Sequence, residues 1–112
     1  MPRARNNKNN KDKRRKAFTG LNTCPPRVRE LLYSVGDCFE HHHYPIIFIS
    51  YLRWRVTVRA KIDDGSFAEI TVCSKGRKYG SSDQHIYFSD GVWLEFKGCD
   101  PQLYRDAIFN QA

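Results

Sequence analysis

The segment LRWRVTVRAKIDDGSFAEITV, residues 52–72, decides the fold class of this chain. From Leu52 to Ile62, apolar residues alternate strictly with Arg, Thr and Lys. Successive side chains of a strand point to opposite faces, so the alternation predicts one β-strand with a buried face and a basic face. The expected buried residues are Leu52, Trp54, Val56, Val58, Ala60 and Ile62, and the expected basic residues are Arg53, Arg55, Arg59 and Lys61.

A turn and a second strand follow directly. Asp63-Asp64-Gly65-Ser66 has turn composition, and Ala68, Ile70 and Val72 resume the alternation. Keeping all apolar residues on one face predicts an antiparallel register in which Lys61 lies opposite Glu69. The expected apolar pairs are Ile62 with Ala68, Ala60 with Ile70 and Val58 with Val72.

The flanking segments predict helices and a further hairpin. Apolar residues recur at helical spacing after Pro25-Pro26, and Gly36 is the expected end of that helix. A hairpin is expected over residues 86–97 around Ser89-Asp90-Gly91. A short helix should begin at Asp100-Pro101. The sequence therefore predicts a mainly β, α+β domain: a small antiparallel sheet or partial barrel with a short helix before and after it.

The positive charge of the chain is concentrated at its start. Residues 1–16, MPRARNNKNNKDKRRK, contain eight of the 19 basic residues and one of the 12 acidic residues, which leaves residues 17–112 with 11 of each and no net charge. A segment this polar cannot offset the entropy of ordering. We expect a disordered basic arm over residues 1–16 and a single β-rich domain over residues 17–112. Such an arm can neutralise phosphates, act as a nuclear import signal, or merely aid solubility.

Several other functions are disfavoured by the sequence. No apolar run reaches the roughly 18–20 residues of a membrane span, and no signal peptide is apparent. We therefore expect no membrane partner, and cysteines that are reduced thiols or metal ligands rather than disulfides. No catalytic motif appears, and we expect neither enzyme activity nor a cofactor. Cys38 and His41 have the spacing of a zinc-ligand pair, but a second tight pair is lacking, so no metal is expected. The residues considered for zinc are Cys24, Cys38, His41 and His43.

The basic strand face, next to exposed aromatic residues, is typical of a surface that binds single-stranded nucleic acid. Cations follow the phosphates, and rings stack on bases without demanding a sequence. The alternative is a solvated outer face with weak ion pairs, such as Lys61 with Glu69. The candidate binding residues are Arg53, Arg55, Arg59 and Lys61 on the strand, Lys75, Arg77, Lys78 and Tyr79 in the next loop, Tyr87, Trp93 and Phe67 as rings, and Arg14, Arg15 and Lys16 in the arm.

The Arg-rich strand with the Ile62–Val72 turn and second strand resembles the first hairpin of OB-fold domains in replication protein A and in telomere end-protection proteins of the CST type. The resemblance covers roughly residues 45–75 and implies a partial OB-like barrel. It also implies binding of single-stranded DNA or RNA by Arg53, Arg55, Arg59 and the Lys75–Tyr79 loop. The sequence departs from the family because the usual helix between strands three and four is not visible. A fifth strand after Trp93–Lys97 is also missing.

Two further interpretations remain. A small viral RNA-binding protein, such as a coat protein or RNA-silencing suppressor, also has an Arg/Lys/Asn arm ahead of a neutral β-domain. In a nuclear protein-interaction module, the arm would serve only as a nuclear import signal. We therefore expect a nucleic-acid partner, with a protein partner or homo-oligomer as a further option. The expected location is the nucleus, or alternatively a virion or the host cytoplasm.

Overall fold

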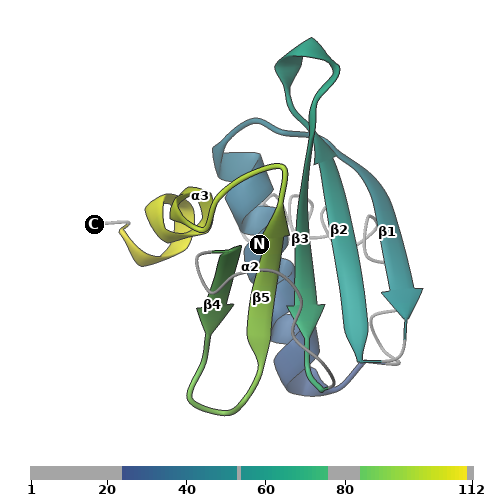
Figure 1. The fold of residues 1–112 in the computed structure, drawn as a ribbon, viewed down its shortest axis with the longest axis vertical. Helices are drawn as coiled ribbons and strands as arrows, with labels where there is room; N and C mark the ends of the chain where they lie inside the picture. Colours follow the sequence, from purple (N-terminus) through teal and green to yellow (C-terminus); the bar gives the residue numbers. More distant parts are fainter. Residues whose placement is uncertain (1–23, 53, 76–83, 111–112) are drawn as a thin grey trace, which may run out of the picture.

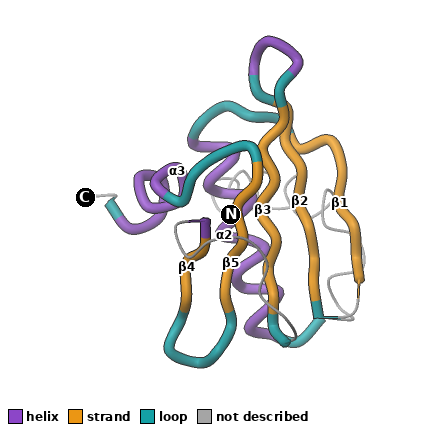
Figure 2. The backbone as a smooth tube through the Cα atoms, in the orientation of Figure 1, coloured by secondary structure: helices purple, strands orange, loops and turns teal. Residues whose placement is uncertain are grey.

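The computed structural model describes residues 24–52, 54–75 and 84–110. These residues form a five-stranded antiparallel sheet with a helix before it and a short helical segment after it (Figures 1 and 2), which confirms the predicted α+β, mainly β fold. The predicted arm, residues 1–16, lies outside the described residues. The elements are α2 (Pro26–His41), β1 (Ile46–Leu52), β2 (Arg55–Lys61), the 3-10 turn η2 (Asp63–Gly65), β3 (Phe67–Cys73), β4 (His85–Tyr87), β5 (Trp93–Lys97), α3 (Gln102–Tyr104) and the π-helical turn η4 (Arg105–Phe109).

The strand order in the sheet is β1-β2-β3-β5-β4. The first three strands follow one another as a meander, whereas β5 pairs with β3 and places β4 at the far edge. All four pairings are antiparallel. Within the described residues, β1 and β4 are therefore the two edge strands of an open sheet.

The core lies between α2 and one face of the sheet, and in Figure 1 α2 lies behind the strands. Leu32 and Val35 of α2 are fully buried, as are Val58, Ile70 and Leu94 from the three central strands. Burying an apolar side chain of this size contributes roughly 1.5–3 kcal/mol, so this layer is the main source of stability. Even-numbered positions on these strands face α2, as the alternation predicted for β2 and β3.

Helix α2 is longer than predicted. Gly36 lies buried in its interior, and the helix continues to His41 because Phe39 extends the apolar stripe by another turn. The helix ends where His43 adopts the left-handed conformation, with φ of 62°, and where the Tyr44 backbone N–H donates to the Phe39 carbonyl. The prediction that Gly36 ends the helix was wrong because packing of the stripe outweighs the weak helix propensity of one glycine.

The predicted single strand from Leu52 to Ile62 is in fact two strands. β1 ends at Leu52 and β2 begins at Arg55, and Trp54 lies in the turn between them with φ of 71°. Its side chain is 41% exposed, so the prediction that Trp54 lies on the buried face was wrong. The alternation is compatible with both arrangements, and no Gly, Pro or Asn marks this reversal of the chain.

The β2–β3 register differs from the prediction by two residues. Val58 pairs with Ile70 and Ala60 with Ala68, so the apolar face is as predicted, but Glu69 lies opposite Arg59 instead of Lys61. The cause is the turn: residues 63–65 form a 3-10 turn, Gly65 closes it with φ of 75°, and Ile62 N–H donates to the Ser66 carbonyl. A two-residue shift preserves the faces, so hydrophobic patterning alone cannot detect it.

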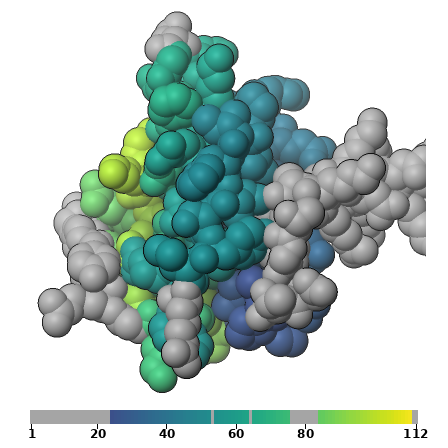
Figure 3. Space-filling model, turned by 90° about the vertical axis from the view of Figure 1, so that its right-hand side faces the viewer, coloured from purple at the N-terminus to yellow at the C-terminus, as the bar shows by residue number. Residues whose placement is uncertain are grey.

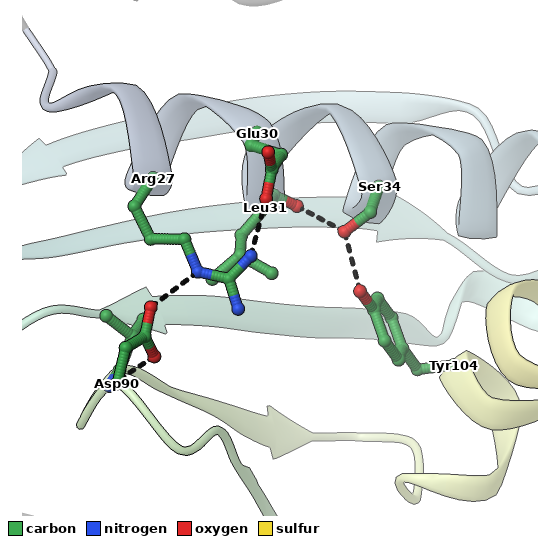
Figure 4. A network of polar contacts seen from close by, with 7 residues as sticks. Arg27, Glu30, Leu31, Ser34, Asp90 and Tyr104 are labelled. Carbon is green, nitrogen blue, oxygen red and sulfur yellow. Dashed lines mark hydrogen bonds and ion pairs between the residues drawn. The ribbon is translucent and has the colours of Figure 1, made fainter.

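Polar contacts fasten α2 to the second half of the chain (Figure 4). Arg27 Nε donates to Asp90 Oδ2 over 2.7 Å, which joins α2 to the β4–β5 turn. Ser34 Oγ donates to the Leu31 carbonyl and lies 2.6 Å from the hydroxyl of Tyr104, so Tyr104 is the donor in that second bond. The tyrosine is 1% exposed, and its hydrogen bond satisfies a polar atom that would otherwise be buried without a partner.

The C-terminal helical segment begins one residue later than predicted. Pro101, and not Asp100, is its N-cap, but the Asp100 carboxylate accepts a hydrogen bond of 2.8 Å from the backbone N–H of Gln102, the first helical residue. Pro101 occupies the position before the first helical residue. Tyr104 and Ala107 are buried against the core.

Candidate nucleic-acid interface

The sheet face opposite α2 is called here the outer face, and it carries the side chains that the sequence marked as basic. Strand pairing aligns its residues in rows: Phe48 of β1 lies beside Arg59 of β2, which lies beside Glu69 of β3 and then Lys97 of β5. The odd-numbered residues of β2, β3, β4 and β5 and the even-numbered residues 48, 50 and 52 of β1 share this face. Arg55, Arg59 and Lys61 therefore lie on one face, as predicted.

Arg55 belongs to a polar network centred on Glu95. Its Nη2 lies 2.5 Å from Glu95 Oε1 and its Nη1 lies 3.2 Å from Oε2, a two-point contact that spans β3. The indole Nε1 of Trp93 donates to Oε2 over 2.9 Å, and His85 Nε2 lies 3.7 Å from the same oxygen. Only 26% of the Arg55 side chain and 13% of the Glu95 side chain are exposed. This network links β2, β5 and β4, and we call it the Glu95 network.

Two predicted base-stacking residues lie beside the Glu95 network. Trp93 is only 4% exposed, so the prediction that its ring is available on the surface was wrong. Its place on the strand puts it on the outer face, but the ring is buried there, and its indole nitrogen donates to Glu95 within the network. Tyr87 is 47% exposed, and its ring stacks on that of the buried His85 with centroids 5.6 Å apart.

The other end of the outer face presents aromatic rings around a cation. Arg59 Cζ lies 5.4 Å from the ring centroid of Phe48 and 5.8 Å from that of Phe67. The rings are 50% and 46% exposed. Lys61 lies opposite Phe67 in the β2–β3 pairing and is exposed, as is Lys97. These five residues, Phe48, Arg59, Lys61, Phe67 and Lys97, are called the aromatic–basic patch.

The electrostatics of the patch favour an anion. Arg59 pairs with Glu69, with its Nε 2.7 Å and its Nη2 2.6 Å from Oε2. Among the described side chains, the patch therefore has three cations and an ion pair with one carboxylate, that of Glu69. The exposed Asp63 in η2, the turn after β2, reduces the positive potential at the end of the patch that contains Lys61. Because a guanidinium has five N–H donors and Glu69 engages two of its nitrogens, Arg59 keeps donors for a further acceptor.

A second pairing of ring and cation lies at the opposite end of the sheet, at the start of β2. Lys75 Nζ stands 5.0 Å from the ring centroid of Trp54. Beside it is a hollow of about 280 Å³, lined mostly by apolar side chains that include Tyr51, Leu52 and Val28. Lys75 was predicted as a binding residue from its loop, whereas Trp54 was assigned to the core. The other predicted residues, Arg53, Arg77, Lys78, Tyr79, Arg14, Arg15 and Lys16, lie outside the described residues.

The cysteines and histidines considered for zinc are not gathered into a site. Cys24, Cys38, His41 and His43 all lie in the described part of the chain, where no group of three or more His, Cys, Asp or Glu side chains could hold a metal ion. Cys38 is buried, its thiol lies 3.7 Å from the Leu103 carbonyl, and burial raises its pKa to about 12. All four cysteines of the chain are free thiols.

Sequence reasoning missed two members of the patch. Phe48 lies in an apolar segment without alternation, so nothing in that segment distinguishes outward from inward residues. Lys97 is remote from β2 in the sequence, and only the β3–β5 pairing brings it beside Glu69 and the β2 cations. The available signal for Phe48 was its place in a strand next to an Arg-rich strand.

The chain was also compared with known proteins. No protein-family model, curated protein or solved structure matches it. The resemblance to OB-fold domains therefore stays an expectation. In the described residues, no helix combines the length and the apolar character needed to cross a membrane.

Proposed function

We propose that this protein binds single-stranded nucleic acid on the outer face of its sheet, through the aromatic–basic patch, and that the basic arm adds phosphate contacts. The observation that carries the proposal is the arrangement of Phe48 and Phe67 around Arg59. Two half-exposed rings on either side of a cation are the elements that single-strand binding requires.

The spacing of the patch suits an extended strand better than a duplex. β1 and β3 flank β2, so the two rings stand roughly 10 Å apart, with the guanidinium between them. A base stacked on each ring would leave the connecting phosphates near Arg59 and Lys61. In a duplex the bases are already stacked and paired, so their faces are not available to the rings.

The arm supports the same function. Eight cations in residues 1–16 against one acid can neutralise several phosphates and release their counterions, which contributes affinity that does not depend on sequence. The patch would then select unpaired bases, and the arm would add the salt-dependent part of the affinity.

The test is a titration of the full chain with labelled 20-nucleotide single strands of DNA and RNA, and with the matching duplexes. The double variant Phe48→Ala/Phe67→Ala should bind single strands at least roughly 30-fold more weakly, because loss of stacking costs about 1–3 kcal/mol per base, or about 2–6 kcal/mol for the two rings. The matched control is Phe109→Ala, which removes a ring that is 51% exposed but lies on η4, away from the outer face. The proposal fails if both variants bind as the wild type does, or if duplexes bind as tightly as single strands.

A further inference from the structure

The two edges of the sheet differ in a way that points to self-association. β4 is only three residues long, whereas β1 is seven residues long. The sequence of β1, IIFISYL, has no charged residue. Natural edge strands are usually protected by shortness, charge, proline or a bulge. The β1–β2 pairing is irregular between Ile46 and Phe48, but Phe48–Leu52 is regular and has neither charge nor proline, and such an edge pairs with other strands. In Figure 3, which views the molecule from the β1 side, blue-green side chains of this region face the viewer across its middle.

The backbone groups available at this edge can be assigned. Lys61 N–H donates to the Pro45 carbonyl, so the odd-numbered residues of β2 bond to β1. Their partners in β1 include Ser50, which lies opposite Thr57. The alternate residues Ile49 and Tyr51 therefore direct their N–H and C=O groups away from β2, toward the edge that no described strand covers.

The side chains of β1 are symmetric about Ser50. On the outer face Phe48 and Leu52 flank Ser50, and Ile49 and Tyr51 flank it on the other face. Placing a second β1 antiparallel to the first, with Ser50 opposite Ser50, sets Phe48 against Leu52 and Ile49 against Tyr51. These four large side chains then meet in pairs, the two small residues meet at the two-fold axis, and the outward N–H and C=O groups of Ile49 and Tyr51 bond to each other.

We infer that β1 pairs with β1 of a second copy of this chain, which joins two sheets into one continuous ten-stranded sheet with a two-fold axis through Ser50. Such an interface is isologous, as most homodimer interfaces are. Leu52 is 65% exposed, Phe48 is 50% exposed and Tyr51 is 39% exposed, so these three side chains of each copy contribute about 250–300 Å² of apolar surface. With the backbone this reaches the small end of specific interfaces, so the dimer should be weak, with a Kd in roughly the 10–100 µM range.

The dimer would also shape the proposed binding surface. An axis perpendicular to the sheet keeps both outer faces on the same side, so the two aromatic–basic patches would lie on one surface with Phe48 of each copy near the seam. This consequence rests on the proposed function, but the pairing itself does not. The experiment is therefore carried out without nucleic acid.

The test is sedimentation velocity of the full chain over about 5–300 µM, a range chosen around the expected Kd. The wild type should shift from monomer to dimer. Ser50→Lys and Ser50→Glu should each weaken association at least 10-fold, because like charges face each other at the axis. An equimolar mixture of the two should associate at least as tightly as the wild type. Ser89→Lys and Ser89→Glu, in the exposed β4–β5 turn, are the matched controls and should leave the dimer unchanged.

Melting curves of the Ser50 variants establish that they are folded. Should either fail to fold, Leu52→Lys replaces the most exposed residue of the edge and should weaken the dimer as well. A wild type that stays monomeric over the whole range overturns the inference. The inference is also overturned if the Ser50 and Leu52 substitutions leave association unchanged, or if Ser50→Lys and Ser50→Glu do not associate with each other. In either case the contact would lie elsewhere.

Discussion

Arg55 and Arg59 lie on the same strand and the same face, four residues apart, yet their surroundings differ. Arg55 makes a two-point contact with a carboxylate that is only 13% exposed, next to a buried tryptophan. Arg59 forms an ion pair with Glu69 that is partly exposed to solvent, and it lies between two exposed rings. Strand periodicity assigns a side chain to a face, but the residues on neighbouring strands decide whether it stabilises the fold or meets a ligand. The outer face is thus divided into the Glu95 network and the aromatic–basic patch.

The largest expected effect separates the two tryptophans. Trp93→Ala should lower the free energy of unfolding by roughly 3–5 kcal/mol, because it removes a large buried ring and a hydrogen bond to Glu95. Trp54→Ala should cost less than about 1 kcal/mol, since the ring is 41% exposed in a turn. Urea unfolding of both variants measures the difference. Equal losses in the free energy of unfolding would show that the buried and the exposed tryptophan contribute equally to stability.

The next effect concerns Arg55. Arg55→Met should cost about 2–3 kcal/mol, because it removes the main cationic partner of a mostly buried carboxylate. The double variant Arg55→Met/Glu95→Gln should recover part of that loss, since no charge is then left without its partner. Thermal and urea unfolding of the single and double variants provide the measurement. If the losses simply add, the two residues are not coupled.

A backbone position next to the patch gives a comparable effect. Gly98 has φ of 76°, and a Cβ placed there would lie 2.2 Å from the Phe67 carbonyl oxygen. Gly98→Ala should therefore destabilise the fold by about 2–3 kcal/mol and displace Phe67. Gly91→Ala is the matched control: its φ is also positive, at 88°, but the space around it is open, so about 1 kcal/mol is expected. Similar losses in the two variants would rule out the close contact as the cause.

The smallest effect on stability is expected at Arg59. Arg59→Gln should change the free energy of unfolding by about 0–1 kcal/mol, because the pair with Glu69 is substantially exposed and screened by solvent. Single-strand binding should nevertheless weaken about 5- to 10-fold at low salt, and by less at high salt. Unfolding curves and titrations on the same preparation measure both quantities. A variant that is clearly destabilised but binds normally would assign Arg59 to the fold.

The fold could be predicted from the sequence wherever periodicity carries the information. Val56, Val58 and Ala60 face the core, and the second hairpin turns at Ser89-Asp90-Gly91, both as expected. The errors occur where tertiary context decides. The turn at Trp54 has no turn residue to mark it. The observed β2–β3 register differs from the predicted one by two residues, and the apolar pattern is the same in both registers.

The candidate site was predictable only in part for the same reason. Arg59 and Lys61 could be placed on an exposed face from alternation alone. Their neighbours Phe48 and Lys97 come from strands that are remote in the sequence and become adjacent only through the strand order. The burial of Trp93 and its hydrogen bond to Glu95 are likewise tertiary features, which local spacing does not reveal.

The division of the outer face can be tested without any substitution, by following the backbone amide signals of the isotope-labelled full chain by NMR during titration with a 20-nucleotide single strand. Signals of Phe48, Arg59, Lys61 and Phe67 should shift and saturate together, whereas those of the Glu95 network, Arg55, His85 and Glu95, should stay close to their free positions. Shifts concentrated at Arg55, His85 and Glu95, or no saturable shift on the outer face, would contradict the assignment of binding to the aromatic–basic patch.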